Sequence, residues 1–295
     1  MYILFAFLLG SFLSVMISVN GSLVSAFDSY NGTMLIHWFG LITTGILLAA
    51  SRQWIHFDRK APKWIYFAGV VGILTTLFQS SSFGRISMLN ISALGLLGQT
   101  VASLFIDSFG LFGMKKHAFR RNTLVGFLFA VAGIFLMLDS SAGSSVSAVL
   151  MSLAAGVSIV TARSMNSRLA DSIGNLQGTM INFAAAFPIT LLLSLTLGAH
   201  PGRLPVLSNA PWWMYLGGIC GVFGVFMNNY LVPHMSAFQM TLMSFLGMLF
   251  GSTVIDLISG AAYSPQSLAG GLLIAAGMIL NMFLKHQEEK KAANG

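Results

Sequence analysis

The chain has 295 residues, of which 56% are hydrophobic and only 8% are charged. A soluble globular domain carries about a quarter of charged residues, so this composition excludes a soluble fold of the same length. The single cysteine, Cys220, excludes an internal disulfide framework, and no cluster of cysteine and histidine has the spacing of a metal site. We therefore expect neither a metal nor a cofactor.

Apolar segments of membrane-spanning length follow one another along the chain and are joined by short connections. Lipid offers the backbone no hydrogen-bond partners, and the apolar runs are continuous instead of alternating, so helices are expected. The predicted spans are residues 3–26, 32–51, 64–82, 87–111, 122–139, 147–166, 177–198, 212–232, 237–260 and 267–284. The first run lacks a basic leader and a clear cleavage site, and we interpret it as a span and not as a signal peptide.

The basic residues lie mostly on one side of the predicted membrane. With the N-terminus in the cytoplasm, 13 of the 15 lysines and arginines fall inside, among them Arg163 and Arg168, and only Arg85 and Arg203 fall outside. The positive-inside rule then places both termini in the cytoplasm. The net charge of +7 is accordingly interpreted as a topology signal, and no nucleic-acid partner is expected.

An internal repeat relates the two halves of the chain. Residues 61–107 align without gaps with residues 210–256 at an offset of 149, with 12 of 47 positions identical. Residues 20–40 align with residues 166–186 at an offset of 146. Apolar helices can resemble one another by composition alone, but paired prolines, tryptophans and aspartates at one fixed offset are hard to obtain that way. The aligned pairs include Pro62 and Pro211, Trp64 and Trp213, Gly98 and Gly247, Ser103 and Ser252, and Asp107 and Asp256.

Each half contains five predicted spans, and an odd number inverts the second copy across the membrane. The predicted fold is an all-α integral membrane protein with ten transmembrane helices in a 5+5 inverted repeat. Its parts are residues 1–144, residues 145–285 and a charged cytoplasmic tail, residues 286–295. Inverted repeats are typical of secondary transporters, which bind their substrate near the membrane midplane between the halves.

A block of the fourth span resembles a known family. The run from Leu97-Gly98-Gln99 through Ser103 to Ile106–Gly113 resembles the GQ…S…iDxFGLFG signature of the YdcZ-like inner-membrane exporter branch of the drug/metabolite transporter superfamily. Asn20, followed by Leu23, resembles the first-helix segment of that branch. The resemblance implies a drug/metabolite-transporter-like fold, export and a bacterial inner membrane, with this chain as a fused form of two repeats.

The sequence also departs from that family's pattern. Met248 occupies the position in the second half that corresponds to Gln99, so the second copy of the family motif is degraded. Related small multidrug transporters exchange protons through a first-helix glutamate, whereas the predicted first and sixth helices here contain no carboxylate. The resemblance therefore does not carry that mechanism over.

Several central polar or adaptable side chains are candidates for a substrate cavity. For the amides, hydrogen bonds between helices are the alternative role, and for the histidine a purely structural bond is the alternative. The predicted cavity residues are Gln99, Asn20, Asn166, Gln79, Asn228, Met248 and His37.

Two carboxylates, Asp107 and Asp256, fall inside predicted spans and are repeat equivalents. An ionisable group in the membrane is costly, so both are candidates for gating or for proton coupling, which makes protons the candidate coupling ion. Each lies about 12 Å from its helix centre at a rise of about 1.5 Å per residue. A structural anchor is the alternative role.

These observations predict secondary-active transport of a small organic metabolite or drug, with export implied by the resemblance. An uncoupled carrier or channel is the alternative. An intramembrane lipid-modifying enzyme is disfavoured because the spans lack a charged catalytic cluster, so the chain is predicted not to be an enzyme. The expected partners are the solute and the lipid bilayer, with a monomer or homodimer as the assembly. The scarcity of charge favours a neutral, zwitterionic or modestly amphipathic solute.

Overall fold

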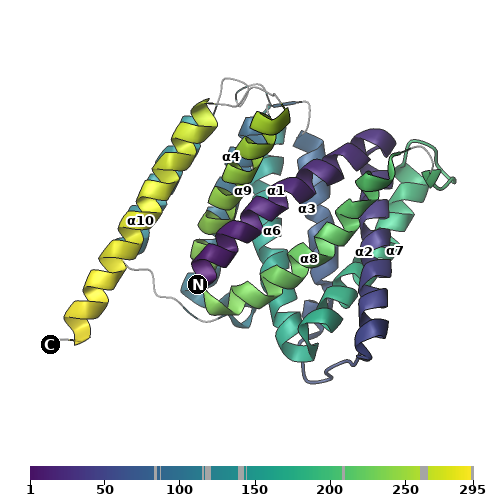
Figure 1. Ribbon diagram of the computed structural model, residues 1–295, viewed down its shortest axis with the longest axis horizontal. Helices are drawn as coiled ribbons and strands as arrows, with labels where there is room; N and C mark the ends of the chain where they lie inside the picture. Colours follow the sequence, from purple (N-terminus) through teal and green to yellow (C-terminus); the bar gives the residue numbers. More distant parts are fainter. Residues whose placement is uncertain are drawn as a thin grey trace.

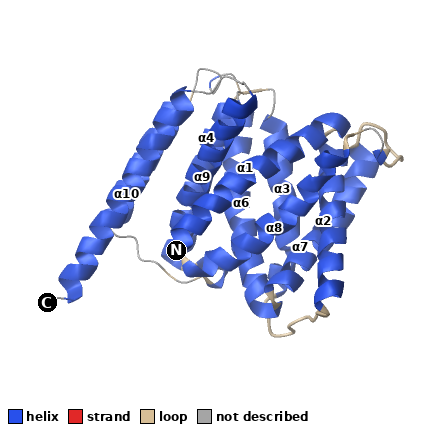
Figure 2. Cartoon of the chain, viewed as in Figure 1, coloured by secondary structure: helices blue, strands red, loops and turns tan. Residues whose placement is uncertain are grey.

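The computed structural model describes residues 1–82, 85–86, 88–114, 116, 121–138, 143, 145–207, 210–259 and 265–293. The α-helices in this part of the chain are α1 Tyr2–Phe27, α2 Ser29–Ser51, α3 Ala68–Ser82, α4 Met88–Phe109, α5 Arg121–Met137, α6 Val146–Ile173, α7 Asn175–Leu197, α8 Leu216–Leu231, α9 Ala237–Ser259 and α10 Pro265–Ala293. Short 3-10 turns are η1 Lys63–Phe67, η2 Leu111–Gly113, η5 Trp212–Tyr215 and η6 Val232–His234. Figure 2 shows that the drawn elements are helical throughout.

Each predicted span overlaps one α-helix, the third and eighth also include 3-10 turns, and two helices are markedly longer than predicted. The predicted sixth span ends at residue 166, but α6 continues to Ile173 and includes Asp171. The prediction of no carboxylate in the sixth helix is therefore wrong. Similarly, α10 continues to Ala293, so most of the charged tail is helical. In both cases charged residues mark where the apolar segment ends, and the helix continues past that point.

Seven helical segments of the described chain are long and apolar enough, by length and composition, to cross a membrane. They are Tyr2–Phe27, Ser29–Ser51, Asn90–Phe109, Val146–Ile173, Asn175–Leu197, Trp212–His234 and Ala237–Ile255. Three shorter apolar helices are Lys63–Gln79, Leu124–Met137 and Leu268–Gly277. The protein is thus a multi-pass helical membrane protein.

The helices pack in pairs that combine the two halves of the chain. α1 packs along α9, α4 along α6, α2 along α7, and α5 along α10. In Figure 1 the α10 side of the molecule forms one edge, and α2 with α7 forms the other. An apolar core between α4, α5, α9 and α10 is centred on Leu96, Ile134, Leu242 and Ile274, which have no exposed surface.

The bundle has two ends, defined by the helix termini that meet there. At the proximal end, Tyr2 at the start of α1 stacks on His234, and α4 ends beside the start of α9. At the distal end, α1 ends beside the start of α8, where Phe27 contacts Tyr215. α6 runs from the distal to the proximal end, because Ala148 near its start packs with Ile91 near the start of α4 and Val160 packs with Ile106 near the end of α4.

Glycines set the closest helix contacts, and these contacts repeat between the halves. A Cβ on Gly98 of α4 would overlap the carbonyl oxygen of Leu153 in α6. A Cβ on Gly247 of α9 would overlap the carbonyl oxygen of Phe7 in α1. Leu153 and Phe7 are equivalent at the offset of 146, as Gly98 and Gly247 are at the offset of 149. The sequence repeat therefore corresponds to repeated backbone contacts.

A second pair of contacts fixes the same register. Gly156 of α6 has no room for a Cβ because of the Gly95 carbonyl, and Gly10 of α1 has none because of the Ser244 carbonyl. The offset of 146 consequently extends along α1 and α6 beyond the block aligned by sequence.

The turns between α1 and α2 and between α6 and α7 also match. Asp28 has φ 103° and its equivalent Gly174 has φ 99°, a region that costs a side chain strain but is open to glycine. Hydrogen bonds hold Asp28 there: Oδ1 accepts the N–H of Tyr30 and Asn31 at 2.8 and 3.1 Å, and Oδ2 accepts the N–H of Ala199 at 3.1 Å. Asp28 thus caps α2 and connects it to Ala199, just after the end of α7.

Candidate functional site

At the proximal end, Asp107 joins the last turn of α4 to the first residues of α9. Its Oδ1 accepts the N–H of Ala237 at 2.8 Å and its Oδ2 accepts the N–H of Phe238 at 2.9 Å. The carboxylate is 5% exposed. The first N–H groups of a helix have no partner within the helix and favour a negative charge. Asp107 therefore supplies the cap of α9 from another helix.

One turn deeper, a chain of hydrogen bonds connects α6, α9 and α4. Arg163 donates from Nη2 to Oγ1 of Thr241 at 2.7 Å, Thr241 lies 2.7 Å from Oγ of Ser103, and Ser103 donates to the carbonyl of Gln99 at 2.6 Å. A guanidinium can only donate and a carbonyl can only accept, so Thr241 donates to Ser103. We call Ser103, Asp107, Arg163 and Thr241 the α4–α6–α9 junction.

Arg163 is the residue that sequence reasoning missed. With the sixth span drawn as residues 147–166, Arg163 fell at its end and was counted as a cytoplasmic charge. Because α6 runs to Ile173, Arg163 lies ten residues, almost three turns, before the helix end. In the sequence, four uncharged residues separate Arg163 from the next basic residue, Arg168, and this spacing is the signal that could have located it inside the helix.

Gln99 and Met248 occupy equivalent positions in α4 and α9, and both are half-buried. Gln99 lies one turn from Ser103 and shares its helix face. In the part of the chain that the structure describes, its side-chain amide has no hydrogen-bond partner. Met248 packs at the edge of the core between α4, α5, α9 and α10.

Asn20 and Asn166 also lie at equivalent positions, on α1 and α6. Asn20 is half-buried and Asn166 is 7% exposed. The Oδ1 atom of each is buried without a hydrogen-bond partner. Gly217 of α8 makes room for the Asn20 amide, since a Cβ there would overlap its Oδ1. Both amides therefore retain hydrogen-bonding capacity inside the bundle.

Gln79 and Asn228 differ in their surroundings although they are equivalent in sequence. Gln79 is exposed on α3, whereas Asn228 is half-buried and donates to the carbonyl of Gly224 in its own helix at 2.8 Å. The neighbouring Asn229 donates to Oδ1 of Asn175 at 3.1 Å and so joins α8 to α7. The bond between helices is made by Asn229 and not by the predicted Asn228.

His37 is half-buried on α2 and its Nδ1 lies 2.8 Å from the carbonyl of Thr33 in the same helix. Asp256 belongs to α9, but its side chain lies outside the described residues. Among the described residues, no hydrogen bond joins any two of the predicted cavity residues. Within the described chain, no group of three metal-ligating side chains occurs.

Equivalent positions at the two ends of the bundle differ in exposure. At the proximal end, Thr241 and Ser167 are 1% and 0% exposed. Their distal equivalents, Ser92 and Gly21, are both exposed, and a Cβ on Gly21 would meet nothing within 4 Å. Ile17, the distal equivalent of Arg163, is 50% exposed.

Helix packing shows the same difference. α6 packs against α8, whereas the equivalent helices α1 and α3 do not pack to a comparable extent. At these positions the proximal end is more tightly packed than the distal end.

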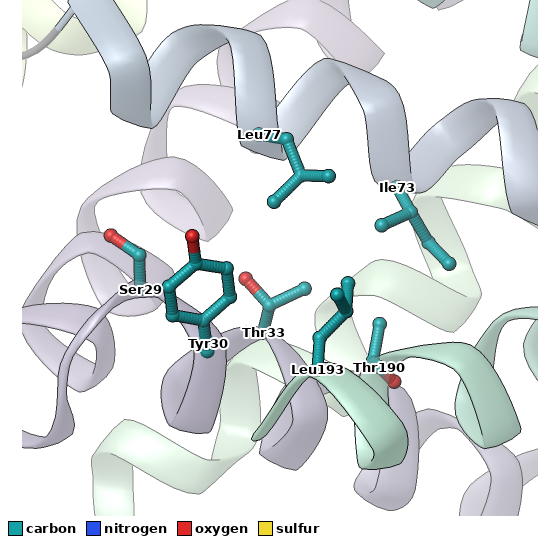
Figure 3. Close-up of a pocket in the computed structure, with 7 residues that line it drawn as sticks. All are labelled: Ser29, Tyr30, Thr33, Ile73, Leu77, Thr190 and Leu193. Atoms are coloured by element: carbon teal, nitrogen blue, oxygen red, sulfur yellow. The ribbon is translucent and has the colours of Figure 1, made fainter. Parts of the chain in front are cut away.

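Among the described residues, two hollows outside the junction are notable. A cavity between α2, α3 and α7, lined by Tyr30, Thr33, Ile73 and Thr190 among others (Figure 3), has a volume of about 10 Å³, which suits at most one water molecule. An apolar groove of about 270 Å³ between α4 and α6 includes the exposed Phe105. The first is too small for an organic solute, and the second opens on the outer apolar surface.

Comparison with known proteins identifies the family. The family model described as "Putative inner membrane exporter, YdcZ" matches residues 1–136 and again residues 147–280. The chain belongs to this family of the drug/metabolite transporters, in a two-repeat form, which confirms the resemblance of the fourth span. No curated protein matches the chain.

A solved crystal structure has the same fold. It is 19% identical in sequence, with 98% of this chain and 97% of that chain covered and a TM-score of 0.71. The similarity extends over the whole of both chains, so the arrangement of helices described above is shared by another protein.

Proposed function

We propose that the protein is a secondary transporter of a small organic solute in the bacterial inner membrane, with ten spans arranged as two inverted five-helix repeats. The equivalent contacts of Gly98 and Gly247 support the repeat arrangement. Family membership favours export. The basic residues favour an orientation with the proximal end, and both termini, facing the cytoplasm.

The observation that carries this proposal is the unequal closure of equivalent ends. Thr241 and Ser167 are buried at the proximal end while Ser92 and Gly21 are exposed at the distal end. Two similar halves that pack differently can exchange their packings at low cost, and this exchange is the basis of alternating access. On this proposal, the unequal packing is that of a state open toward the outside.

Asp107 is suited to the role of a gate anchor. Both of its oxygens bind backbone N–H groups of α9, so releasing α9 from α4 breaks both bonds together. Gln99, Asn20 and Asn166 are the polar groups that we expect to face the solute. Proton coupling through Asp107 or Asp256 is the alternative role for the two carboxylates.

Counterflow in proteoliposomes tests the carrier. Vesicles loaded with a high concentration of one unlabelled solute are diluted into a trace of the same labelled solute, across a library of metabolites and drugs. A carrier accumulates the label transiently against its gradient, whereas a channel only equilibrates it. Equilibration without an overshoot for every transported solute would exclude the proposed carrier and favour the channel.

Thiol labelling tests the assigned state. In a Cys220→Ser background, Gly21→Cys and Ser167→Cys place equivalent thiols at the distal and proximal ends. We expect a membrane-impermeant maleimide to label Gly21→Cys from the outside and to leave Ser167→Cys unlabelled. Equal labelling of both thiols would contradict closure of the proximal end.

A further inference from the structure

Arg163 combines a permanent charge with incomplete bonding. An arginine stays protonated in proteins and has five N–H donors. Within the described chain, its guanidinium makes a single hydrogen bond, to Thr241, and no ion pair with a carboxylate. The residue is half-buried and so is not fully enclosed, and its remaining donors are not used by the described residues.

The nearest compensating charge is already committed to another contact. Asp107 interacts electrostatically with Arg163, but both of its oxygens are bonded to the N–H groups of Ala237 and Phe238. A charge inside a membrane protein that lacks a directly bonded partner is costly. Such a group is expected to face a polar pathway and to be compensated there by a ligand.

The surroundings of Arg163 restrict the kind of ligand. Ile106, Val160 and Ala237 form an apolar cluster beside the junction, with Phe112 and Met114 packed against it. A single guanidinium balances one negative charge, and its planar pair of donors fits a carboxylate. Asp107 close by disfavours a ligand with two or more negative charges. The equivalent position in the other half is Ile17, so the site is present only once.

We propose that Arg163 binds the carboxylate group of the transported solute, a small monocarboxylate or zwitterion with an apolar or amide-bearing body. This inference rests on the proposed transport function. The hydrogen-bond chain from Arg163 through Thr241 and Ser103 ends at the backbone carbonyl of Gln99, and we expect the side-chain amide of Gln99 to contact the body of the solute. Arg163 is then the residue that selects an anionic group.

Binding of matched acid and amide pairs tests the assignment. The purified full-length protein in detergent is titrated with butyrate and butyramide, benzoate and benzamide, and phenylacetate and phenylacetamide, with melting temperature and calorimetry as readouts. We expect wild type to bind at least one carboxylate more tightly than its amide. In Arg163→Gln the carboxylate affinity falls by about tenfold or more, the amide affinity is unchanged, and the preference disappears.

Two further variants separate charge from folding. Arg163→Lys keeps the charge and loses the planar donor pair, and we expect it to retain part of the carboxylate preference. Arg168→Gln removes a charge from the same helix outside the junction and is expected to bind carboxylates as wild type does. If Arg163→Gln does not fold, Arg163→Lys decides, because a reduced preference supports the carboxylate contact and an unchanged one contradicts it.

The outcomes distinguish this inference from the proposed function. Equal binding of carboxylates by wild type and Arg163→Gln, or binding of the amides alone, would overturn the role of Arg163 while counterflow of neutral solutes still identifies a carrier. Binding of no member of the panel by folded wild type would also overturn the monocarboxylate assignment. Counterflow that fails for every solute would count against the carrier itself.

Discussion

The two ends of the α4–α9 pair are built from equivalent residues but make different contacts. At the proximal end, Ser103 and Thr241 are buried and bonded to each other. At the distal end, their equivalents Ser252 and Ser92 are half-buried and exposed. The helix-to-helix glycine contacts, by contrast, are the same in both halves. The scaffold therefore repeats, while the buried hydrogen bond between the two helices is made at one end.

The largest expected effect concerns the repeated scaffold. Leucine at Gly98 or Gly247 would force a side chain into the backbone of the neighbouring helix, and we expect each variant to lose about 3 kcal/mol or more of stability or to fail to fold. Gly72→Leu is the control because a Cβ at Gly72 meets nothing within 4 Å. Yield and melting temperature in detergent are the measurements. A large effect at only one of the two glycines would contradict their equivalence.

Removal of Asp107 should selectively weaken the proximal end. Asp107→Ala breaks two charge-assisted bonds to the start of α9, and we expect a loss of about 3 kcal/mol. Asp107→Asn keeps one carbonyl acceptor and should lose about half as much. The free energy of unfolding is the measurement, and labelling of Ser167→Cys should increase in the same variant. Unchanged labelling would mean that the proximal closure does not depend on Asp107.

The smallest expected effect is at the turn between α1 and α2. Asp28→Ala loses the cap of α2 and keeps the unfavourable φ of 103°, so we expect a loss of about 1–2 kcal/mol. Asp28→Gly should lose less, because glycine adopts this conformation freely, as Gly174 does at the equivalent turn. Melting temperatures of the two variants check the difference. A less stable glycine variant would show that the strain at Asp28 is negligible.

The helices could be predicted from sequence because apolar length determines a span, and the aligned tryptophans and aspartates revealed the repeat. The end of α6 could not be predicted from sequence. Its charged residues Arg163, Arg168 and Asp171 resemble the border of a membrane segment, although the helix continues to Ile173. The partners of Asp107 were also hidden from sequence. They are backbone N–H groups of Ala237 and Phe238, which carry no residue-specific signal.

The predicted cavity residues show the same limit. Counting along the predicted span places Gln99 near a helix centre. The sequence does not reveal that Ser103, on the same helix face, is hydrogen-bonded to Thr241, which in turn binds Arg163. The contacts of Thr241 with Arg163 and Ser103 join side chains 78 and 138 positions apart. Such contacts depend on how the helices cross, and the crossing is set by small residues such as Gly98 and Gly156. The periodicity of apolar residues along the sequence does not specify how the helices cross.

The glycine contacts also determine which parts of the protein can move as solid pieces. α4 is held to α6 through Gly98 and Gly156, and α1 is held to α9 through Gly247 and Gly10, with backbone against backbone. Helices in such contact cannot slide or separate without losing it. Each rigid piece therefore takes one helix from the first half of the chain and one from the second. The mechanical units of this protein are crossed helix pairs, and they do not coincide with the two copies produced by duplication.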